Sequence, residues 1–135
     1  MPSTITIPPV QDIAPGLIAG MRVPPQIILR AADARPFELQ DLIPSDTRFK
    51  ILVFPGDVNS PGTQKEKLLA FSDSLCGDTG VLTRIASGKG PKSSRPWTTM
   101  FEVITVITGK KETANYTSVP AQIVSHWSKC VFRHC

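Results

Sequence analysis

The sequence of 135 residues lacks the patterns of a disulfide scaffold or a membrane protein. Its 3 cysteines, Cys76, Cys130 and Cys135, contain no CxxC spacing. Such an odd set argues against a disulfide framework and favours a reducing compartment, so we expect a cytoplasmic location. No apolar run approaches the roughly 18 residues that span a membrane, and no membrane association is expected. The opening MPSTITIPPV has no basic segment followed by a long apolar one, so no signal peptide is predicted.

Aromatic residues are also scarce, at 7% of the chain. The formal net charge is +4 and the isoelectric point about 9.2, which permits weak attraction to polyanions. The basic residues are scattered, however, and no basic stripe is interleaved with aromatics. The sequence therefore predicts no nucleic-acid partner.

Catalytic fingerprints are missing where an α/β protein would carry them. The apolar run FKILVF at residues 49–54 is followed by PGDVNSPG, whereas a dinucleotide fold needs GxGxxG there and a thioredoxin needs CxxC. Asp57 could act as a general base, but a turn or cap role is the favoured interpretation. Residues 87–90, SGKG, resemble the end of a phosphate loop but lack its first glycine and its final Ser or Thr.

The C-terminal HWSKCVFRHC contains possible metal ligands. His126, Cys130 and His134 are spaced i, i+4, i+8, with Cys135 next to them, and a continuous helix would align the first three. No second ligand pair with zinc-like spacing exists, so an incidental cluster is favoured and no metal site is predicted. Cys76 lies on an apolar helical stripe and is interpreted as a core residue.

What the chain does contain is an alternation of strand and helix patterns. Many of the 13 prolines lie within the first 36 residues, so residues 1–24 are expected to form an extended arm. The non-alternating apolar run 49–54 is typical of a strand buried on both faces, placed centrally with helices on either side. Thr63 and Glu66 match a helix capping box, and Gly77 is suited to a left-handed helix end.

The remaining elements follow from local patterns. We expect strands at 26–30, 81–85 and 101–108, a short helix or turn at 37–43 that plugs the sheet edge, a helix ending at Cys76, a polar loop at 87–97, and a helix at 119–127 that opens near Pro120. Together they predict the α/β class: a sandwich with a central mixed sheet flanked by helices.

Several separated blocks resemble the C-terminal domain of phenol 2-monooxygenase, the phenol hydroxylase family of FAD-dependent aromatic monooxygenases. The resemblance covers roughly residues 13–129, and its blocks agree in order and spacing. The matching positions are Gly20, Arg22, Arg30, Asp33, Leu39, Arg48, Phe49, Gly56, Asp57, the strand 101–108, Pro120 and Trp127.

The resemblance implies a thioredoxin-like fold without redox cysteines, in a domain that follows the FAD and substrate domains and is associated with dimerisation. FAD and NADPH are implied for the full-length family alone. Because its flavin-binding and catalytic motifs belong to the preceding domains, no catalytic, cofactor-binding or metal residue is assigned in this chain. The matching positions are structural.

The family continues after the tryptophan helix to a late strand with a Val-Arg-Pro-Asp-Gly-like segment, where this sequence has CVFRHC. We therefore expect an arm at 1–24, a thioredoxin-like domain at 25–129 and a divergent tail at 130–135, with the final sheet strand missing. A missing strand would expose the edge of 101–108.

Two functions remain open. The first is a non-catalytic dimerisation or interaction module, standalone or a remnant of a flavin monooxygenase, and its expected partner is a second copy. The alternative is an accessory part of a flavin monooxygenase in aromatic or polyketide hydroxylation, as in fungal secondary metabolism. An enzyme acting alone is not expected, because the flavin fold is absent.

Overall fold

The residues that the structure describes form one mixed sheet of five strands. A computed structural model describes residues 12, 13, 15–59, 62–86, 96–109, 116–124 and 130–133. In this part of the chain the strand order is β2-β1-β5-β4-β3. β1 pairs antiparallel with β2 and β5, while β4 pairs parallel with β3 and β5. The strands are β1 (Ile27–Arg30), β2 (Pro36–Glu38), β3 (Phe49–Gly56), β4 (Phe101–Thr108) and β5 (Cys130–Arg133).

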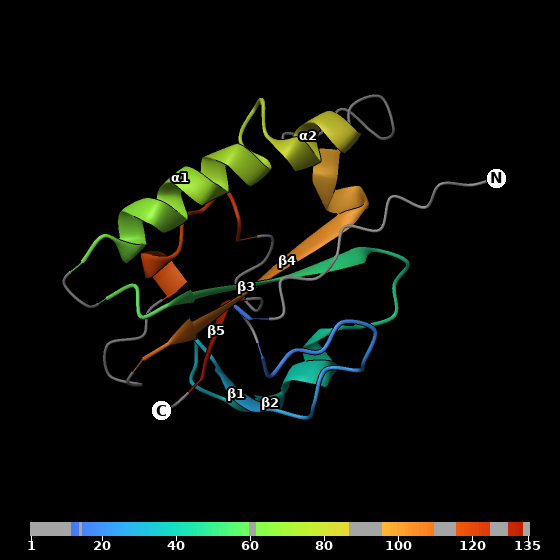
Figure 1. The fold of residues 1–135 in the computed structure, drawn as a ribbon, viewed down its shortest axis with the longest axis vertical. Coiled ribbons are helices and arrows are strands. Elements are labelled where there is room, and N and C mark those ends of the chain that lie inside the picture. Colours follow the sequence, from blue (N-terminus) through green and yellow to red (C-terminus); the bar gives the residue numbers. More distant parts are fainter. Residues whose placement is uncertain are drawn as a thin grey trace.

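Within the described residues, two α-helices lie together on one face of the sheet (Figure 1). They are α1 (Gln64–Cys76) and α2 (Val81–Ala86). Three short 3-10 helices complete the described elements: η1 (Leu39–Leu42), η2 (Pro96–Thr99) and η3 (Tyr116–Ser118). Figure 1 places η1 on the side of the sheet opposite α1 and α2, next to the blue N-terminal segment. The expected layer of helices is thus present on one face, and a 3-10 helix with part of the arm covers the other.

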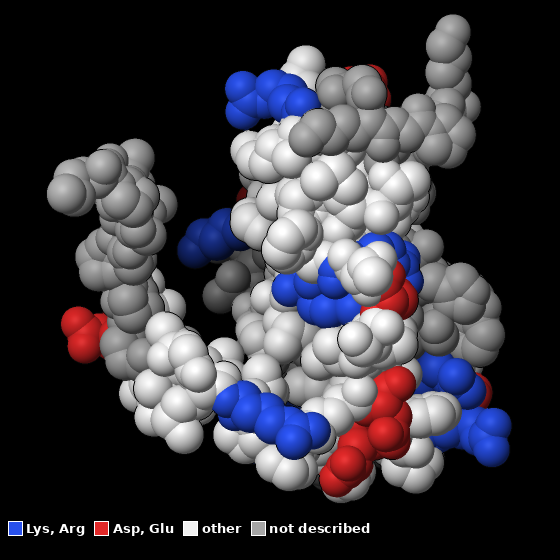
Figure 2. All heavy atoms as spheres, turned by 90° about the vertical axis from the view of Figure 1, so that its right-hand side faces the viewer, with Lys and Arg blue, Asp and Glu red and all other residues white. Residues whose placement is uncertain are grey.

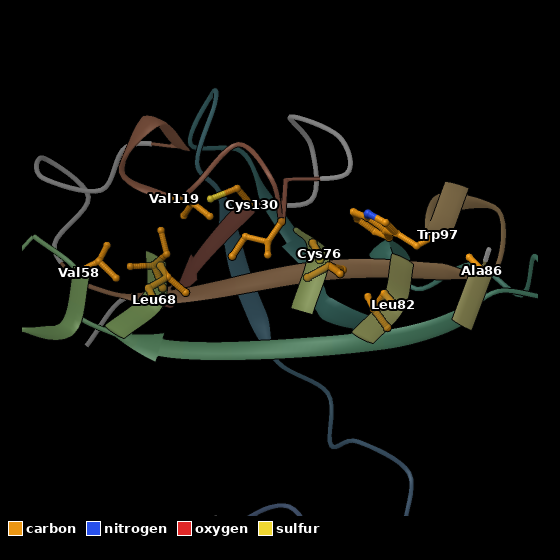
Figure 3. Close-up of a cluster of buried hydrophobic side chains, with 11 residues drawn as sticks. Val58, Leu68, Cys76, Leu82, Ala86, Trp97, Val119 and Cys130 are labelled. Carbon is orange, nitrogen blue, oxygen red and sulfur yellow. The ribbon is translucent and has the colours of Figure 1, made fainter. Parts of the chain in front are cut away.

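A buried apolar cluster joins the helices to the sheet (Figure 3). Leu68 and Cys76 from α1 and Leu82 and Ala86 from α2 meet Trp97, which is 1% exposed. The predicted helix that ends at Cys76 is confirmed as α1. The prediction that Cys76 lies in the core is also confirmed. Burial of this many large side chains is the main favourable term for a domain of this size.

A second cluster covers the opposite face. Ile104 and Val106 of β4 and Val131 of β5 pack there with Ile28, Leu39 and Leu42. Because Val103 and Ile107 point into the first cluster, β4 is buried on both faces, as its apolar sequence predicted. The expected plug at residues 37–43 is also present, as the end of β2 followed by η1.

The strand at 49–54 exists, but the expectation that it lies centrally is wrong. β3 is an edge strand of the sheet, with β2 at the other edge. The side chains of Phe49 and Phe54 are 66% and 52% exposed. Its run of apolar residues has a simple reason. Ile51 and Val53 face the helix-side cluster, and Leu52 faces the opposite cluster. An apolar run reports that both faces are covered, and it carries no information on how many strands lie beside it.

Residues 81–85 were expected to be a strand and form the helix α2 instead. Leu82 and Ala86, four residues apart, are buried, while Val81 and Ile85 are 43% and 48% exposed. This i, i+4 burial is the helical periodicity, which overrides the strand preference of Val, Thr and Ile. A run of five residues is too short for the sequence to separate the two periods.

The C-terminal segment corrects a further expectation. Cys130–Arg133 forms β5, which lies between β1 and β4 in the middle of the sheet. The backbone N–H of Ala31 donates to the carbonyl oxygen of Cys130 at 3.0 Å. The sheet therefore has a strand where one was expected to be missing, and β4 has no free edge.

The ends of α1 differ from the expected pattern. Thr63 precedes the helix but makes no side-chain capping bond. Gly77 ends it in an extended conformation, φ −62° and ψ 174°, and not in the left-handed one. Glycine is still required there, because a Cβ would lie 2.4 Å from the carbonyl oxygen of Asp73. Residues 121–123 form a turn where a helix was expected, and residues 125–129 lie outside the described part.

Deleting residues 130–135 should abolish cooperative unfolding. The deletion removes Cys130 and Val131, both fully buried, and the strand that links β1 to β4. Each lost core side chain costs about 2–5 kcal/mol, against a total stability of about 5–15 kcal/mol for a typical domain. Thermal unfolding followed by circular dichroism measures the effect. The matched control is deletion of residues 134–135 alone, which leaves β5 intact. Equal melting curves for the two variants would contradict the placement of β5.

Candidate self-association surface

Two glycines at positions that match the family adopt backbone conformations that other residues rarely adopt. Gly20 has φ +83° in the segment before β1, and Gly56 has φ +77° at the end of β3. A Cβ built on either glycine would meet nothing within 4 Å. The requirement is therefore conformational, since the left-handed region disfavours a side chain. Gly56 lies where the pairing of β3 with β4 shifts register, so it helps to end that strand.

Arg30 and Asp33 fasten the turn between β1 and β2. The Arg30 guanidinium binds the carboxylate of Asp33 through both of its oxygens, with Nε to Oδ1 at 2.9 Å, and stacks 4.6 Å from the Phe37 ring centroid. Hydrogen bonds from Arg30 lower the pKa of Asp33 to about 2. Arg22 Nη2 donates to Gln40 Oε1 at 3.2 Å, which ties the arm to η1. These contacts hold the turn and the arm in place.

Arg48 belongs to a compact group of four charges at the start of β3. We name Asp46, Arg48, Lys50 and Glu102 the charge cluster. Glu102, on β4, accepts from Arg48 Nη2 at 3.0 Å and from Lys50 Nζ at 2.6 Å. Asp46 accepts from Lys50 Nζ at 2.6 Å and from Arg48 Nε at 2.9 Å. Two positive and two negative side chains thus neutralise one another and bind β3 to β4.

Burial makes the charge cluster more than a surface ion pair. The side chain of Glu102 is 4% exposed and that of Lys50 is 13% exposed. Hydrogen bonds from Arg48 and then Lys50 hold the pKa of Asp46 well below its usual range. Burial opposes charge on Lys50, but bonds to Asp46 and Glu102 outweigh it and raise the pKa of Lys50. Asp46, Arg48 and Lys50 are therefore charged at neutral pH. Glu102 and Lys50 were not singled out from sequence, although a charge inside a buried strand is a readable signal.

The other matching positions have modest roles. Phe49 packs against Phe101 with ring centroids 5.7 Å apart, and it stays largely exposed. Asp57 accepts the backbone N–H of Asn59 at 3.0 Å, which is the turn role favoured above. Trp127 lies outside the described residues.

The described cysteines are unsuited to redox chemistry. Cys76 and Cys130 are both buried, and neither forms a disulfide. Burial raises the pKa of the Cys130 thiol to about 12, so it is neutral at physiological pH and a poor nucleophile. Cys130 lies on a strand, so the helical alignment with His126 and His134 does not apply, and these histidines lie outside the described residues. No group of three metal-ligating side chains occurs within the described ranges.

A cavity lies between the first half of α1 and residues 117–121. Its volume is about 530 Å³, and Lys65, Leu69, Val119 and Pro120 contribute to its mostly apolar lining. Beside it, Ser118 Oγ lies 2.8 Å from Asn59 Oδ1. Among the described side chains, every buried polar atom has a hydrogen-bond partner. We find no catalytic arrangement in this part of the chain.

Surface charge gives no sign of a polyanion partner on the face seen in Figure 2. Basic and acidic side chains lie beside one another there, without a broad patch of one sign. In the described part of the chain no helix is long and apolar enough to cross a bilayer.

The feature that does call for a partner is the outer side of β3. Within the described ranges, no strand pairs with it. Figure 3 shows β3 running along the border of the sheet, beyond β4. We define the β3 edge as Phe49, Lys50, Leu52 and Phe54. An unpaired strand edge flanked by exposed aromatic rings is a typical site of strand addition.

Replacing Glu102 by glutamine should destabilise the protein by about 3 kcal/mol. The exchange leaves Arg48 and Lys50 without their shared buried counter-charge, and breaking such a pair costs about 3–5 kcal/mol. The lower end applies because Arg48 is 29% exposed. Urea denaturation gives the free energy of unfolding. Asp33→Asn is the matched control, because its ion pair lies on the surface and should contribute much less. Similar losses in both variants would refute the importance of burial.

The whole chain can now be compared with known proteins. Residues 1–133 match the family described as phenol hydroxylase, C-terminal dimerisation domain. The FAD-dependent monooxygenase terD of Aspergillus terreus is 26% identical over 110 residues, which cover 82% of this chain and 17% of that protein. The chain thus spans less than a fifth of the length of this relative. The α/β fold with its mixed sheet agrees with the thioredoxin-like fold that the resemblance implied. The chain belongs to the phenol hydroxylase C-terminal dimerisation domain family.

Proposed function

We propose that this chain acts as a non-catalytic self-association module. The observation that carries the proposal is the match of residues 1–133 to a dimerisation domain family, in a fold whose β3 edge is unpaired within the described part. A border strand with exposed rings of Phe49 and Phe54 supplies a physical reason for association. The expected partner is a second copy of the chain.

The activity of larger relatives gives a second, broader proposal. The name of terD describes an FAD-dependent monooxygenase, and this chain covers 17% of that protein. We therefore propose that the module also associates with, or forms part of, a flavin monooxygenase that acts on aromatic or polyketide substrates. FAD and NADPH would bind outside this chain. A cytoplasmic location remains a prediction, based on the odd cysteine set.

The division of the chain is also a proposal. We place the arm at residues 1–24 and the start of the thioredoxin-like domain at residue 25. We include residues 130–133 in this domain, a choice supported by the pairing of β5 within its sheet. The arm is not independent of it, because Val23 packs on the apolar cluster opposite the helices.

The purified chain should sediment as a dimer at micromolar concentration. Association would bury the exposed side chains of Phe49 and Phe54 away from water, and it would pair the outer edge of β3. Both effects favour the dimer. Analytical ultracentrifugation over a dilution series measures the dissociation constant. A folded species that stays monomeric throughout the series would overturn self-association. A monomer that forms a stable complex with a flavin monooxygenase would favour the second proposal.

The isolated chain should carry no stoichiometric FAD and should not hydroxylate phenol with NADPH. The physical reason is that the sequence has no glycine-rich turn that could hold a pyrophosphate at a helix start. Visible absorbance after purification and equilibrium dialysis against FAD provide the measurement. A yellow protein with one flavin per chain would contradict the assignment as non-catalytic. The reference is a full-length flavin hydroxylase processed in parallel.

A further inference from the structure

We propose that two copies of this chain join through their β3 strands, paired antiparallel about a twofold axis at Leu52. This inference rests on the proposed self-association and specifies the surface that performs it. It makes the two five-stranded sheets continuous across the dimer.

The backbone of β3 shows which groups are available. The N–H of Phe49 donates to the carbonyl oxygen of Met100 at 2.8 Å, and Phe49 is in register with Phe101. In a parallel ladder the peptide groups of alternate residues point to the same side. Phe49, Ile51 and Val53 therefore direct their N–H and C=O groups to β4. Those of Lys50, Leu52 and Phe54 point outward, away from the sheet.

The outward groups are distinct from the face that the arm covers. The side chains of Leu52 and Phe54 line a pocket with Leu17 and Met21 of the arm, on one face of the sheet. Their peptide groups lie in the plane of the sheet, where the described residues place no other strand. Peptide groups left unpaired in this row are best satisfied by another extended strand.

The charge cluster explains why a second copy is tolerated at this edge. A lysine on a border strand normally prevents edge-to-edge pairing, because two copies would repel each other. Lys50 is instead held by Asp46 at 2.6 Å and by Glu102 at 2.6 Å. With Arg48 included, the four side chains have no net charge. The lysine that should protect the β3 edge is thus neutralised from within the same chain.

The register follows from the ends of the free segment. A twofold axis at Leu52 sets Leu52 opposite its own copy and Lys50 opposite Phe54 of the second copy. Pairing then ends at Pro55 and at the register shift before Gly56, which limit the strand at one end. Such an interface is self-complementary and closed, so it yields a dimer and not a filament.

Other exposed apolar residues do not select a partner in this way. Leu69 and Phe71 on α1 are each 44% exposed, and Val81 and Ile85 lie on α2. These side chains would fit many apolar surfaces. The β3 edge demands hydrogen bonds from a strand, and the same edge in a second copy provides them.

Amide hydrogen exchange, resolved by residue with NMR, tests the pairing on the unmodified chain. The amides of Phe49, Ile51 and Val53 should be protected at every protein concentration, because they bond to β4. Those of Lys50, Leu52 and Phe54 should exchange at least about tenfold more slowly above the dissociation constant than below it. Sedimentation of the same samples reports the oligomeric state.

The possible outcomes separate this inference from the proposed function. A dimer with alternate, concentration-dependent protection supports both. A dimer in which the three outward amides exchange quickly overturns the β3 pairing and leaves self-association standing. A folded monomer overturns both.

A variant adds an independent readout. Phe54→Pro removes one outward N–H from each copy without removing a bond to β4, so the dissociation constant should rise by about tenfold or more. Phe54→Thr keeps the N–H and the extended backbone and is the matched control, with Phe71→Ser as a control on the helix surface. A dimer that is weakened by Phe71→Ser and unaffected by Phe54→Pro would contradict the inference. Should Phe54→Pro fail to fold, the exchange pattern of the unmodified chain decides.

Discussion

The pairing of β5 on both of its sides is the interaction on which the rest of the structure depends. On one side β5 is antiparallel to β1, and on the other it is parallel to β4. Without it the hairpin of β1 and β2 would have no bond to the parallel pair of β3 and β4. Its residues also divide between the two apolar clusters, with Cys130 in one and Val131 in the other. The four residues of β5 therefore join the two parts of the sheet and contribute to the apolar cluster on each of its faces.

The positions that match the family have local mechanical roles. Arg30 and Asp33 fix a turn, Arg22 ties the arm to η1, and Gly20 and Gly56 permit backbone conformations that are costly for other residues. Arg48 has a wider effect, because it completes a neutral group around buried Glu102. Thr47, next to Asp46, has φ +68°, an uncommon conformation for a β-branched residue. The chain accepts this local strain at the turn that brings Asp46 to Arg48 and Lys50.

Sequence reasoning identified what local patterns determine. The long helix α1 and the doubly buried strand β4 have clear periodic or continuous apolar signals, and both were found. The short helix α2 was misread because residues 81–85, four of them apolar or β-branched, fit either period until their partners are known. The four residues of β5 had no local signal, since their role is fixed by contacts with β1 and β4. The border position of β3 was also unreadable, because its apolar run reflects cover on both faces. The charge cluster was identified only in part from the sequence. Arg48 was noted because it matches the family, whereas Glu102 was not noted because it lies inside an apolar run.

The place of β5 in the chain has a consequence for folding during synthesis. Leu29 pairs with Phe132, so β1 must wait until Phe132 has left the ribosome before its inner edge is occupied. Contacts between residues so far apart in sequence give a high contact order, which slows folding. Until then β4 lacks one of its two neighbours, and an apolar edge is open to other nascent chains. A chaperone that shields this edge during translation would act on the transient gap between β1 and β4, which the finished protein closes.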